Sequence, residues 1–291
     1  MKLSKVVIPI AGLGTRMLPA TKAIPKEILP LVKKPIIQII VEEIVNAGFK
    51  EIVLITHSSK SSVENHFDSS YELEATLEKR LKRGLLKEIR SISNLDVSIQ
   101  SIRQGYALGL GHAILCSKPI IQKEPFAVVL PDMILGESSK KNNLSKLKED
   151  FERTHTSQIL LGKISIKEAN KYGIAKIEKN KVKKIIEKPS RKNAPSNLFV
   201  VGRYIFSNNI FDYLSKLKKI KNNELELTQA LQDYLDDENE LNFSNLEGSF
   251  YDCGDQLGYA KAFIDFSLKD NEIGSDIKKY IIKKIKNDKE K

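Results

Sequence analysis

Apolar residues near the start of the chain form one short unbroken block and then recur at helical spacing. The block Val6-Val7-Ile8 runs into a glycine-rich segment, which predicts a buried strand that ends in a turn. From Pro35 onward, isoleucine and valine recur with a helical period up to Gly48, as in a helix with a glycine just past its end. Residues 51–56 are a second apolar run. A strand, a helix and a strand in this order form a βαβ unit, whose strands pair in parallel.

Beyond this unit the pattern first keeps alternating between helix and strand and then becomes strand-rich after Ser157. The predicted elements are helical segments at 60–90, 111–117, 208–217, 226–236 and 256–268, and strands at 97–102, 126–130, 158–164, 174–177, 182–187, 199–206 and just before Tyr251. The expected fold class is α/β, with a doubly wound, mostly parallel, Rossmann-like sheet. A smaller mixed β region would pack on that sheet, and a helical tail would follow at the C-terminus.

We expect residues 1–268 to form the body, in two parts at 1–156 and 157–268, and residues 269–291 to form a basic tail. Ile277, Tyr280, Ile281 and Ile285 lie at helical spacing among lysines in this tail. Such a helix packs on the body or on a second subunit. The alternative is a basic helix that lies on a membrane surface.

Composition narrows the class of protein. The chain has 291 residues, of which 41% are hydrophobic and 29% charged, so it can bury a large core and is not a disordered protein. It contains no apolar run of the roughly 18 to 20 residues that a membrane span requires and no signal-peptide profile. Cys116 and Cys253 show neither a disulfide framework nor zinc-ligand spacing. We therefore expect a cytoplasmic protein with no membrane partner.

Lysine and arginine outnumber aspartate and glutamate by 48 to 37, which gives a formal charge of +11. The lysines are spread along the chain, and no aromatic signature of RNA binding accompanies them. We expect the net positive charge to reflect a solvated, lysine-rich surface. The alternative is that it attracts small anions. We expect no nucleic-acid partner.

The most informative segment is the loop that follows the first strand. Gly12 and Gly14 let backbone N–H groups approach a phosphate closely, and Arg16, Lys22 and Lys26 add positive charge just beyond them. This pattern predicts a cradle for a polyphosphate. The loop lacks the Walker A sequence and the third glycine of the dinucleotide-binding fingerprint, which argues against a P-loop NTPase and an NAD dehydrogenase.

The run GxGTRxxPxTKxxPKExLP, from Gly12 to Pro30, resembles the signature loop of the sugar nucleotidyltransferases, and within them of the bacterial uridylyltransferases. The resemblance extends through segments at 56–60, 64–67, 103–105, 109–112, 130–132, 172–173, 187–189, 195–198, 201–204, 224, 227–228 and 252–254, and so covers about residues 3 to 270. It implies a nucleotidyltransferase sheet in which 1–156 mainly binds nucleotide and 157–268 mainly binds sugar. The stretch between Gly173 and Glu187 looks shorter than is usual in the family.

The resemblance implies a reaction of UTP with glucose 1-phosphate that gives UDP-glucose and pyrophosphate. A phosphate oxygen of the sugar attacks the α-phosphorus in line, so positioning and electrostatics carry most of the catalysis and no side-chain nucleophile is needed. The implied catalytic residues are Arg16, Lys26, Asp132 and Lys188.

Asp132 follows an apolar strand, and ligands collect at the carboxyl ends of strands in open α/β sheets. A carboxylate there can hold a Mg²⁺ ion that keeps several waters and bridges phosphate oxygens, which is the role that the resemblance implies. The alternative is an aspartate that caps the next turn. Asp252 matches the second metal-ligand position of related enzymes, and a structural role is equally open for it.

Binding residues for the two substrates are also implied by the resemblance. The nucleotide-binding positions are Ala11, Gly12, Gly14, Thr15, Glu27, Gln104, Gly105 and Gly109. The sugar-binding positions are Gly173, Glu187, Asn197 and Glu224. Gln104 carries donors and an acceptor, so we expect its amide to pair with N3–H and a carbonyl of uracil. The four histidines lack metal-ligand spacing and are interpreted as structural.

Two other functions remain open from the sequence. One is a catalytically silent relative that binds a nucleotide sugar and regulates a partner, although Arg16, Asp132 and Lys188 are all present. The other is a transferase that uses dTTP or another hexose 1-phosphate. The family implies a homodimer or a homotetramer.

Overall fold

The computed structural model describes residues 3–136, 142–218 and 224–289. Its strands are β1 (Lys5–Pro9), β2 (Pro30–Leu31), β3 (Lys34–Pro35), β4 (Glu51–Thr56), β5 (Ser98–Arg103), β6 (Phe126–Val129), β7 (Met133–Leu135), β8 (Ser157–Lys163), β9 (Gly173–Glu178), β10 (Lys181–Glu187), β11 (Leu198–Phe206), β12 (Leu241–Asn245) and β13 (Phe250–Asp252). Its helices are α1 (Ile36–Asn46), α2 (Ser61–Asn65), α3 (Tyr71–Lys79), α4 (Arg83–Ser93), α5 (Leu110–Cys116), α6 (Lys118–Ile121), α7 (Asn143–Thr154), α8 (Ile210–Lys216), α9 (Leu227–Asp236), α10 (Gln256–Lys269) and α11 (Gly274–Lys289).

The N-terminal strands form the parallel sheet that the sequence predicts. β4 pairs with β1 and β5 pairs with β4, while β6 pairs with the opposite edge of β1, all in parallel. Chain order therefore reverses at β1, and the crevice at the carboxyl ends of β1 and β6 is where open α/β sheets bind ligands. The loop with Gly12 and the turn with Asp132 both start there.

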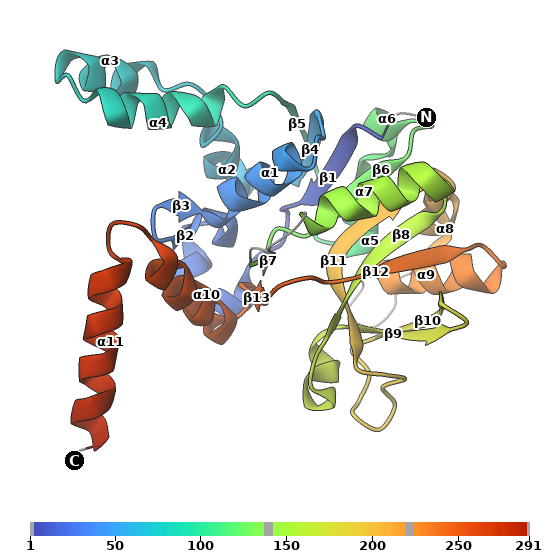
Figure 1. Cartoon of the computed structure of the whole chain (residues 1–291). Helices are drawn as coiled ribbons and strands as arrows, with labels where there is room; N and C mark the ends of the chain where they lie inside the picture. Colours follow the sequence, from blue (N-terminus) through green and yellow to red (C-terminus); the bar gives the residue numbers. More distant parts are fainter. Residues whose placement is uncertain (1–2, 137–141, 219–223, 290–291) are drawn as a thin grey trace.

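Side chains on β1 alternate between two hydrophobic clusters, because successive residues of a strand face opposite sides of the sheet. Val6 and Ile8 belong to one cluster, which α1 and α7 cover, and Val7 belongs to the other, which α5, α8 and α9 cover. Figure 1 shows these helices on the two faces of the sheet. The body is thus a three-layer α/β structure, in agreement with the predicted fold class.

The strand-rich second half is present, but its main strands continue the first sheet instead of packing on it. Antiparallel pairing of β11 with β6 joins the two halves edge to edge, and the order is β10-β9-β11-β6-β1-β4-β5, with β8 and β12 attached through β11. β11 bends at Gly202, where φ is +80° and the register shifts. This bend lets one strand pair with β6 at one end and with β9 at the other. The β9–β10 hairpin, expected to be short, turns at Lys179 and Asn180.

A separate two-stranded ribbon lies near the crevice. β7 pairs antiparallel with β13, and Asp252 of β13 stands opposite Met133 of β7. Asp132 directly precedes Met133, so this ribbon brings Asp252 close to Asp132 although more than a hundred residues separate them.

Two helical hairpins lie at the edge of the molecule. α3 packs with α4, and α11 packs with α10 and extends away from the body (Figure 1). The predicted tail helix is therefore present, with residues 290–291 outside the described part. Several large apolar side chains on these last two helices are exposed.

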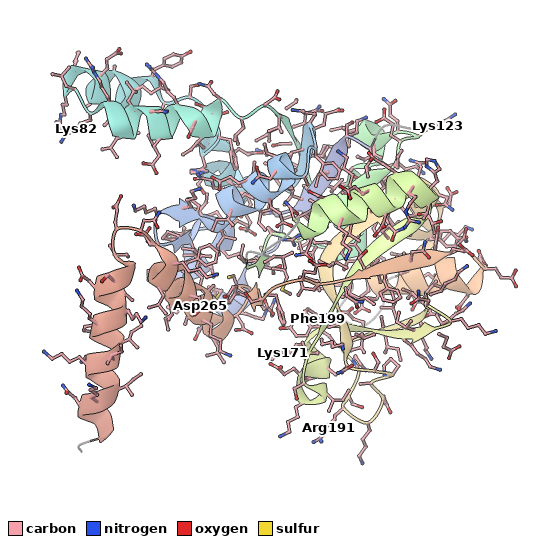
Figure 2. All side chains as sticks on the ribbon, viewed as in Figure 1. Lys82, Lys123, Lys171, Arg191, Phe199 and Asp265 are labelled. Atoms are coloured by element: carbon pink, nitrogen blue, oxygen red, sulfur yellow. The ribbon has the colours of Figure 1, made fainter. Side chains whose placement is uncertain are left out.

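Charged side chains cover the periphery. Lys82, Lys123 and Arg191 extend from different loops at widely separated points of the surface (Figure 2), as expected for a lysine-rich solvated surface. Within the described ranges, no helix combines the length and the apolar character needed to cross a membrane.

Candidate active site

Two cavities meet at the carboxyl ends of β1 and β6. One has a volume of about 410 Å³ and is lined by the loop after β1 and by Gln104 and Gly109. The other has a volume of about 560 Å³ and is lined by the start of β9, the end of β10 and the start of α9. Asp132 and Glu224 line both cavities. The arrangement suits two ligands that must react with each other beside Asp132.

The loop after β1 places backbone and cationic groups at the entrance of both cavities. Gly14 adopts φ +67°, a conformation that side chains disfavour, and its carbonyl accepts a hydrogen bond of 2.7 Å from the Thr21 hydroxyl. A Cβ built on Gly12 would meet nothing within 4 Å, so its backbone is open to a ligand. Arg16 follows in a short 3₁₀ turn, and 57% of its side chain is exposed. A charged ligand can therefore reach this arginine.

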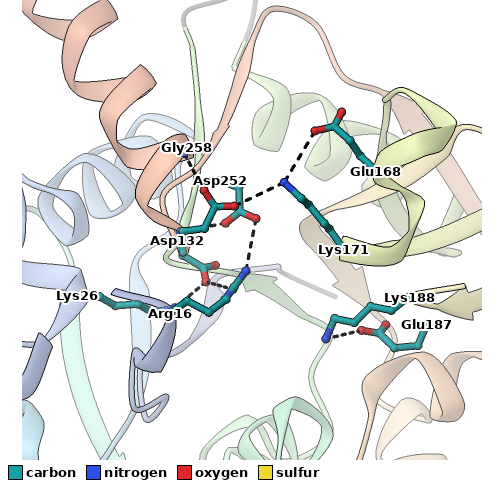
Figure 3. Close-up of polar contacts among 11 residues, drawn as sticks. Arg16, Lys26, Asp132, Glu168, Lys171, Glu187, Lys188, Asp252 and Gly258 are labelled. Atoms are coloured by element: carbon teal, nitrogen blue, oxygen red, sulfur yellow. Dashed lines mark hydrogen bonds and ion pairs between the residues drawn. The ribbon is translucent and has the colours of Figure 1, made fainter. Parts of the chain in front are cut away.

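Asp132 is surrounded by cations (Figure 3). Lys26 donates to its Oδ2 at 2.6 Å, and an Arg16 nitrogen lies 4.0 Å from the same oxygen. Burial acts to raise the pKa of Asp132, but the charge and hydrogen bond of Lys26 and the charge of Arg16 hold that pKa below its usual value. The carboxylate is thus ionised at neutral pH and is able to bind a cation.

Asp252 lies on the other side of Arg16. An Arg16 nitrogen lies 3.8 Å from Oδ2 of Asp252, and the N–H of Gly254 donates to Oδ1 at 2.9 Å. Burial and the negative charge of Asp132 raise the pKa of Asp252 above its usual value. A carboxylate whose charge is destabilised by a neighbouring ionised carboxylate fits a site that binds a divalent cation. Among the described residues, no group of three or more histidine, cysteine, aspartate or glutamate side chains has metal-site geometry.

Gly254 is needed for the approach of these groups. A Cβ at this position would lie 2.7 Å from an Arg16 nitrogen and 2.9 Å from oxygens of both Asp132 and Asp252. Contacts that short do not occur in proteins, so any side chain here would displace Arg16 or a carboxylate.

Arg203 of β11 fixes the turn that carries Asp132. Its side chain is fully buried and forms a bidentate ion pair with Glu43 of α1, at 2.9 and 2.6 Å. Its remaining N–H groups donate to the carbonyls of Leu130 and Met133, at 3.2 and 2.8 Å, and of Gly202. The guanidinium therefore holds the backbone on both sides of Pro131-Asp132.

The larger cavity contains most of the predicted sugar-binding side chains. Gly173, Glu187 and Glu224 line it, together with Lys188, which is predicted to be catalytic. Lys188 has φ +40°, is 62% exposed and lies 3.2 Å from Glu187 (Figure 3). Its charge is free to leave that weak pair for a phosphate group.

In the smaller cavity, Gln104 is buried and both of its amide hydrogens have protein acceptors. Its Nε2 donates to the Gly109 carbonyl at 3.2 Å and lies 2.9 Å from Nδ1 of His112. The amide therefore presents its oxygen to the cavity, and the pairing of Gln104 with uracil stays a prediction. Gly109 O and His112 Nδ1 lie on the nitrogen side of the amide, which leaves Oε1 as the group available to a base.

Glu27, also in the smaller cavity, forms a buried ion pair with Lys60 at 2.8 Å. Only one oxygen of the Glu27 carboxylate, Oε2, forms this ion pair. The other, Oε1, has no hydrogen-bond partner among the described residues although it is buried. A buried carboxylate oxygen without a partner is costly, so a ligand hydroxyl or N–H is the expected donor.

Most predicted nucleotide-binding residues line the smaller cavity, and three predicted residues line neither. Gly14 and Gly105 belong to the surrounding loops, and Asn197 is exposed beyond the larger cavity. Ala11, Gly12, Thr15, Glu27, Gln104 and Gly109 lie on the smaller cavity wall. The roles of all these residues remain predictions.

The structure adds side chains that sequence reasoning did not assign to the site. Tyr172, Glu226 and Thr228 line the larger cavity, and Oγ1 of Thr228 is buried without a partner in the described part of the chain. Burial, followed by the charge of Glu187, raises the pKa of Glu226. Burial and the nearby charge of Asp252 raise the pKa of Tyr172. Tyr172 and Thr228 lie within the segments that resemble the family. This position is the sequence signal that could have identified them as site residues.

Residues 5–270 match the family model described as nucleotidyl transferase. The match covers the whole body, including both cavities. The chain therefore belongs to the nucleotidyl transferase family.

Its relatives include named members of one group within this family. The UTP--glucose-1-phosphate uridylyltransferase of Haemophilus influenzae is 50% identical over 288 residues, which are 95% of this chain and 97% of the relative. The enzyme of the same name from Escherichia coli K12 is 46% identical over 291 residues, with coverage of 96% and 95%. A solved structure described as UTP-bound UGPase from Acinetobacter baumannii has a TM-score of 0.90 and 39% identity, and covers 97% of this chain and 99% of that one.

Proposed function

We propose that this chain transfers the uridylyl group of UTP to glucose 1-phosphate and releases pyrophosphate and UDP-glucose. The observation that carries the proposal is the meeting of two cavities at Asp132, Arg16 and Lys26, at the carboxyl ends of β1 and β6. The relatives that share nearly the full length of the chain bear the name of this activity.

In the reaction, a phosphate oxygen of glucose 1-phosphate bonds to the α-phosphorus as the bond to the leaving pyrophosphate oxygen breaks. The two substrates repel each other, so the site must supply positive charge and hold both in line. Lys26 supplies that charge at the smaller cavity, and Arg16 and Lys188 supply it from the larger one. No protein nucleophile takes part.

Asp132 and Asp252 would hold the divalent cation, which we propose to be Mg²⁺. Two carboxylates suffice for Mg²⁺, since it keeps several waters and takes its other ligands from substrate phosphates. When bound, the ion neutralises phosphate charge in the transition state. Lys26 holds Asp132 ionised and fixes the direction of its carboxylate.

The smaller cavity would bind uridine and the larger one glucose. Glu27 Oε1 accepts a hydrogen bond from the nucleoside, and Gln104 Oε1 accepts one from the base. Glu187 and Glu224 accept hydrogen bonds from sugar hydroxyls, and Thr228 joins them because its hydroxyl has no other partner among the described residues. Gly173 leaves room for the hexose, and Asn197 stays a predicted contact.

This assignment divides the body into a mainly nucleotide-binding part at 1–156 and a mainly sugar-binding part at 157–268. The linings of the cavities support the division. Apart from Glu224, every residue that lines the smaller cavity precedes residue 133, whereas most of those that line the larger cavity follow residue 169.

We also propose a homodimer or homotetramer in which α10 and α11 contact a second copy of the chain. Exposed large apolar side chains are concentrated on these two helices and the turn that joins them: Leu257, Phe263, Ile264, Leu268, Ile273, Tyr280, Ile282 and Ile285. We attribute this exposed apolar patch, on helices at the edge of the body, to contact between copies of the chain.

The assembly is tested by sedimentation velocity on two matched double variants. Ile282→Glu/Ile285→Glu should shift the protein to smaller species, because it places charge in the apolar contact. Lys283→Glu/Lys286→Glu changes charge on the same helix without removing apolar groups and should keep the wild-type assembly. Dissociation in both variants, or in neither, contradicts the proposed contact.

The activity is tested by product analysis. Purified protein with UTP, glucose 1-phosphate and Mg²⁺ should form UDP-glucose and pyrophosphate in equal amounts. A silent relative would bind UDP-glucose without turnover, and a hydrolase would release uridine phosphates in the absence of the sugar. Either result would refute the proposed reaction.

A further inference from the structure

Gln104 is buried beside the smaller cavity, and its protein partners determine which end of its amide faces a ligand. The Gly109 carbonyl lies 3.2 Å from one amide atom, and a carbonyl can only accept a hydrogen bond. That amide atom must therefore be Nε2. No described residue forms a hydrogen bond with Oε1, which is left for the cavity that Gln104 lines.

His112 of α5 makes the second contact with the same nitrogen, at 2.9 Å from Nδ1. Since Nε2 is a donor, Nδ1 must be the unprotonated nitrogen of a neutral imidazole. Burial lowers the pKa of His112, which favours this neutral form, and the Cys116 thiol, 3.9 Å from Nδ1, is also able to donate. His112 does not line either of the two cavities formed by the described residues, so it lies behind Gln104.

The orientation of the amide decides which pyrimidine fits. Uracil carries a hydrogen on N3, which Gln104 Oε1 can accept. Cytosine has a bare acceptor at N3, which would face Oε1 without a hydrogen between them. A reversed amide would present N–H groups and would suit cytosine N3, so a free amide discriminates poorly between the two bases.

We propose that His112 is a positioning residue for base selection, which holds the Gln104 amide with Oε1 toward the nucleotide. The proposal rests on the proposed function, in which Gln104 contacts the base. His112 touches only Gln104 in this role and takes no part in phosphate chemistry.

The test compares kcat/KM for UTP and for CTP in His112→Leu, which removes the acceptor, and in His112→Asn, whose Oδ1 stands on the same side-chain atom as Nδ1. His112→Leu should lower the UTP-to-CTP ratio about tenfold, the effect of one lost hydrogen bond, mainly through KM for UTP. His112→Asn should stay within about threefold of wild type, because it restores an acceptor. Calorimetric binding of UDP and CDP should change in the same sense.

Two further variants separate the outcomes. His66→Leu is the matched control, since His66 is another partly buried histidine that bonds to a glutamine amide, at 3.1 Å from Gln38 Oε1, away from both cavities. It should keep the wild-type ratio. If Gln104→Ala changes the ratio and His112→Leu does not, the positioning role of His112 is wrong and the proposed base site stands. If neither changes it, the base site itself is wrong and the inference fails with it.

Discussion

Arg16 and Lys188 are two cations of the site whose proposed catalytic roles can be separated from folding by mutation. Both side chains are more than half exposed, and their ion pairs with carboxylates are 3.2 Å or longer. Exposed pairs of this kind contribute little to stability. Both line the larger cavity, and that ligand phosphates are their main partners stays a prediction.

Replacing either residue by alanine should therefore lower kcat far more than stability. For Arg16→Ala and Lys188→Ala we expect losses of about 10² to 10³ in kcat, the scale for one preorganised donor that stabilises transition-state charge. Thermal unfolding should stay close to that of the wild type. Normal turnover in either variant would show that its assigned role is wrong.

Asp132 gives the corresponding prediction for the metal. Activity should disappear with EDTA and return with Mg²⁺, and Asp132→Asn should nearly abolish it, because the change keeps the shape and removes the charge that anchors the cation. Asp252→Asn should lower activity as much as Asp132→Asn if Asp252 binds the ion directly, and less if it only orients a bound water. Metal-independent turnover, or a wild-type rate in Asp132→Asn at saturating Mg²⁺, contradicts the assignment.

Gln104 marks the limit of prediction at this scale. The family resemblance implied a contact of Gln104 with the base, which stays a prediction. The use of its two amide hydrogens depends on Gly109 and His112, which reach it only in the folded chain. Asp132 was easier to predict, since it follows a plainly apolar strand in a fold whose ligands gather at strand ends.

At the scale of elements, the buried pair of Arg203 and Glu43 connects β11 and α1 to the turn that carries Asp132. Arg203 is fully buried, so removing its partner leaves an unpaired charge without water. Glu43→Ala should lower the free energy of unfolding by about 3 to 5 kcal/mol.

A matched control stands on the same helix. Glu42 pairs with Lys34 at 2.8 Å near the surface, and Lys34→Ala should change the free energy of unfolding by no more than about 1 kcal/mol. Urea denaturation of both variants makes the comparison. Equal losses of unfolding free energy in Glu43→Ala and Lys34→Ala would mean that the pair of Arg203 and Glu43 does not hold this turn.

The strands and helices themselves were largely predictable, because periodicity reports local structure. The partners of β11 and β13 were not. Antiparallel pairing of β11 with β6 merges the expected second region into the first sheet, and the β7–β13 ribbon places Asp252 beside Asp132. Both depend on contacts between distant parts of the chain, which no local pattern records.

For the whole molecule, the net charge of +11 does little to identify the function. Lysines are spread over the periphery, while the cations that matter for the proposed chemistry are the few gathered at the two cavities. The long-range field still attracts polyanionic substrates, so the rate of substrate capture should fall as salt rises. Absence of nucleic-acid binding and a cytoplasmic location stay predictions.

The central claim is that this site joins uridylyl from UTP to glucose 1-phosphate, and pyrophosphate release with each of the four common nucleoside triphosphates tests it most directly. With glucose 1-phosphate and Mg²⁺, UTP should support turnover at a kcat/KM far above that of ATP, GTP and CTP, because the proposed contact of Gln104 Oε1 requires the N3–H of uracil. Equal turnover with ATP, or none with UTP, would contradict the account.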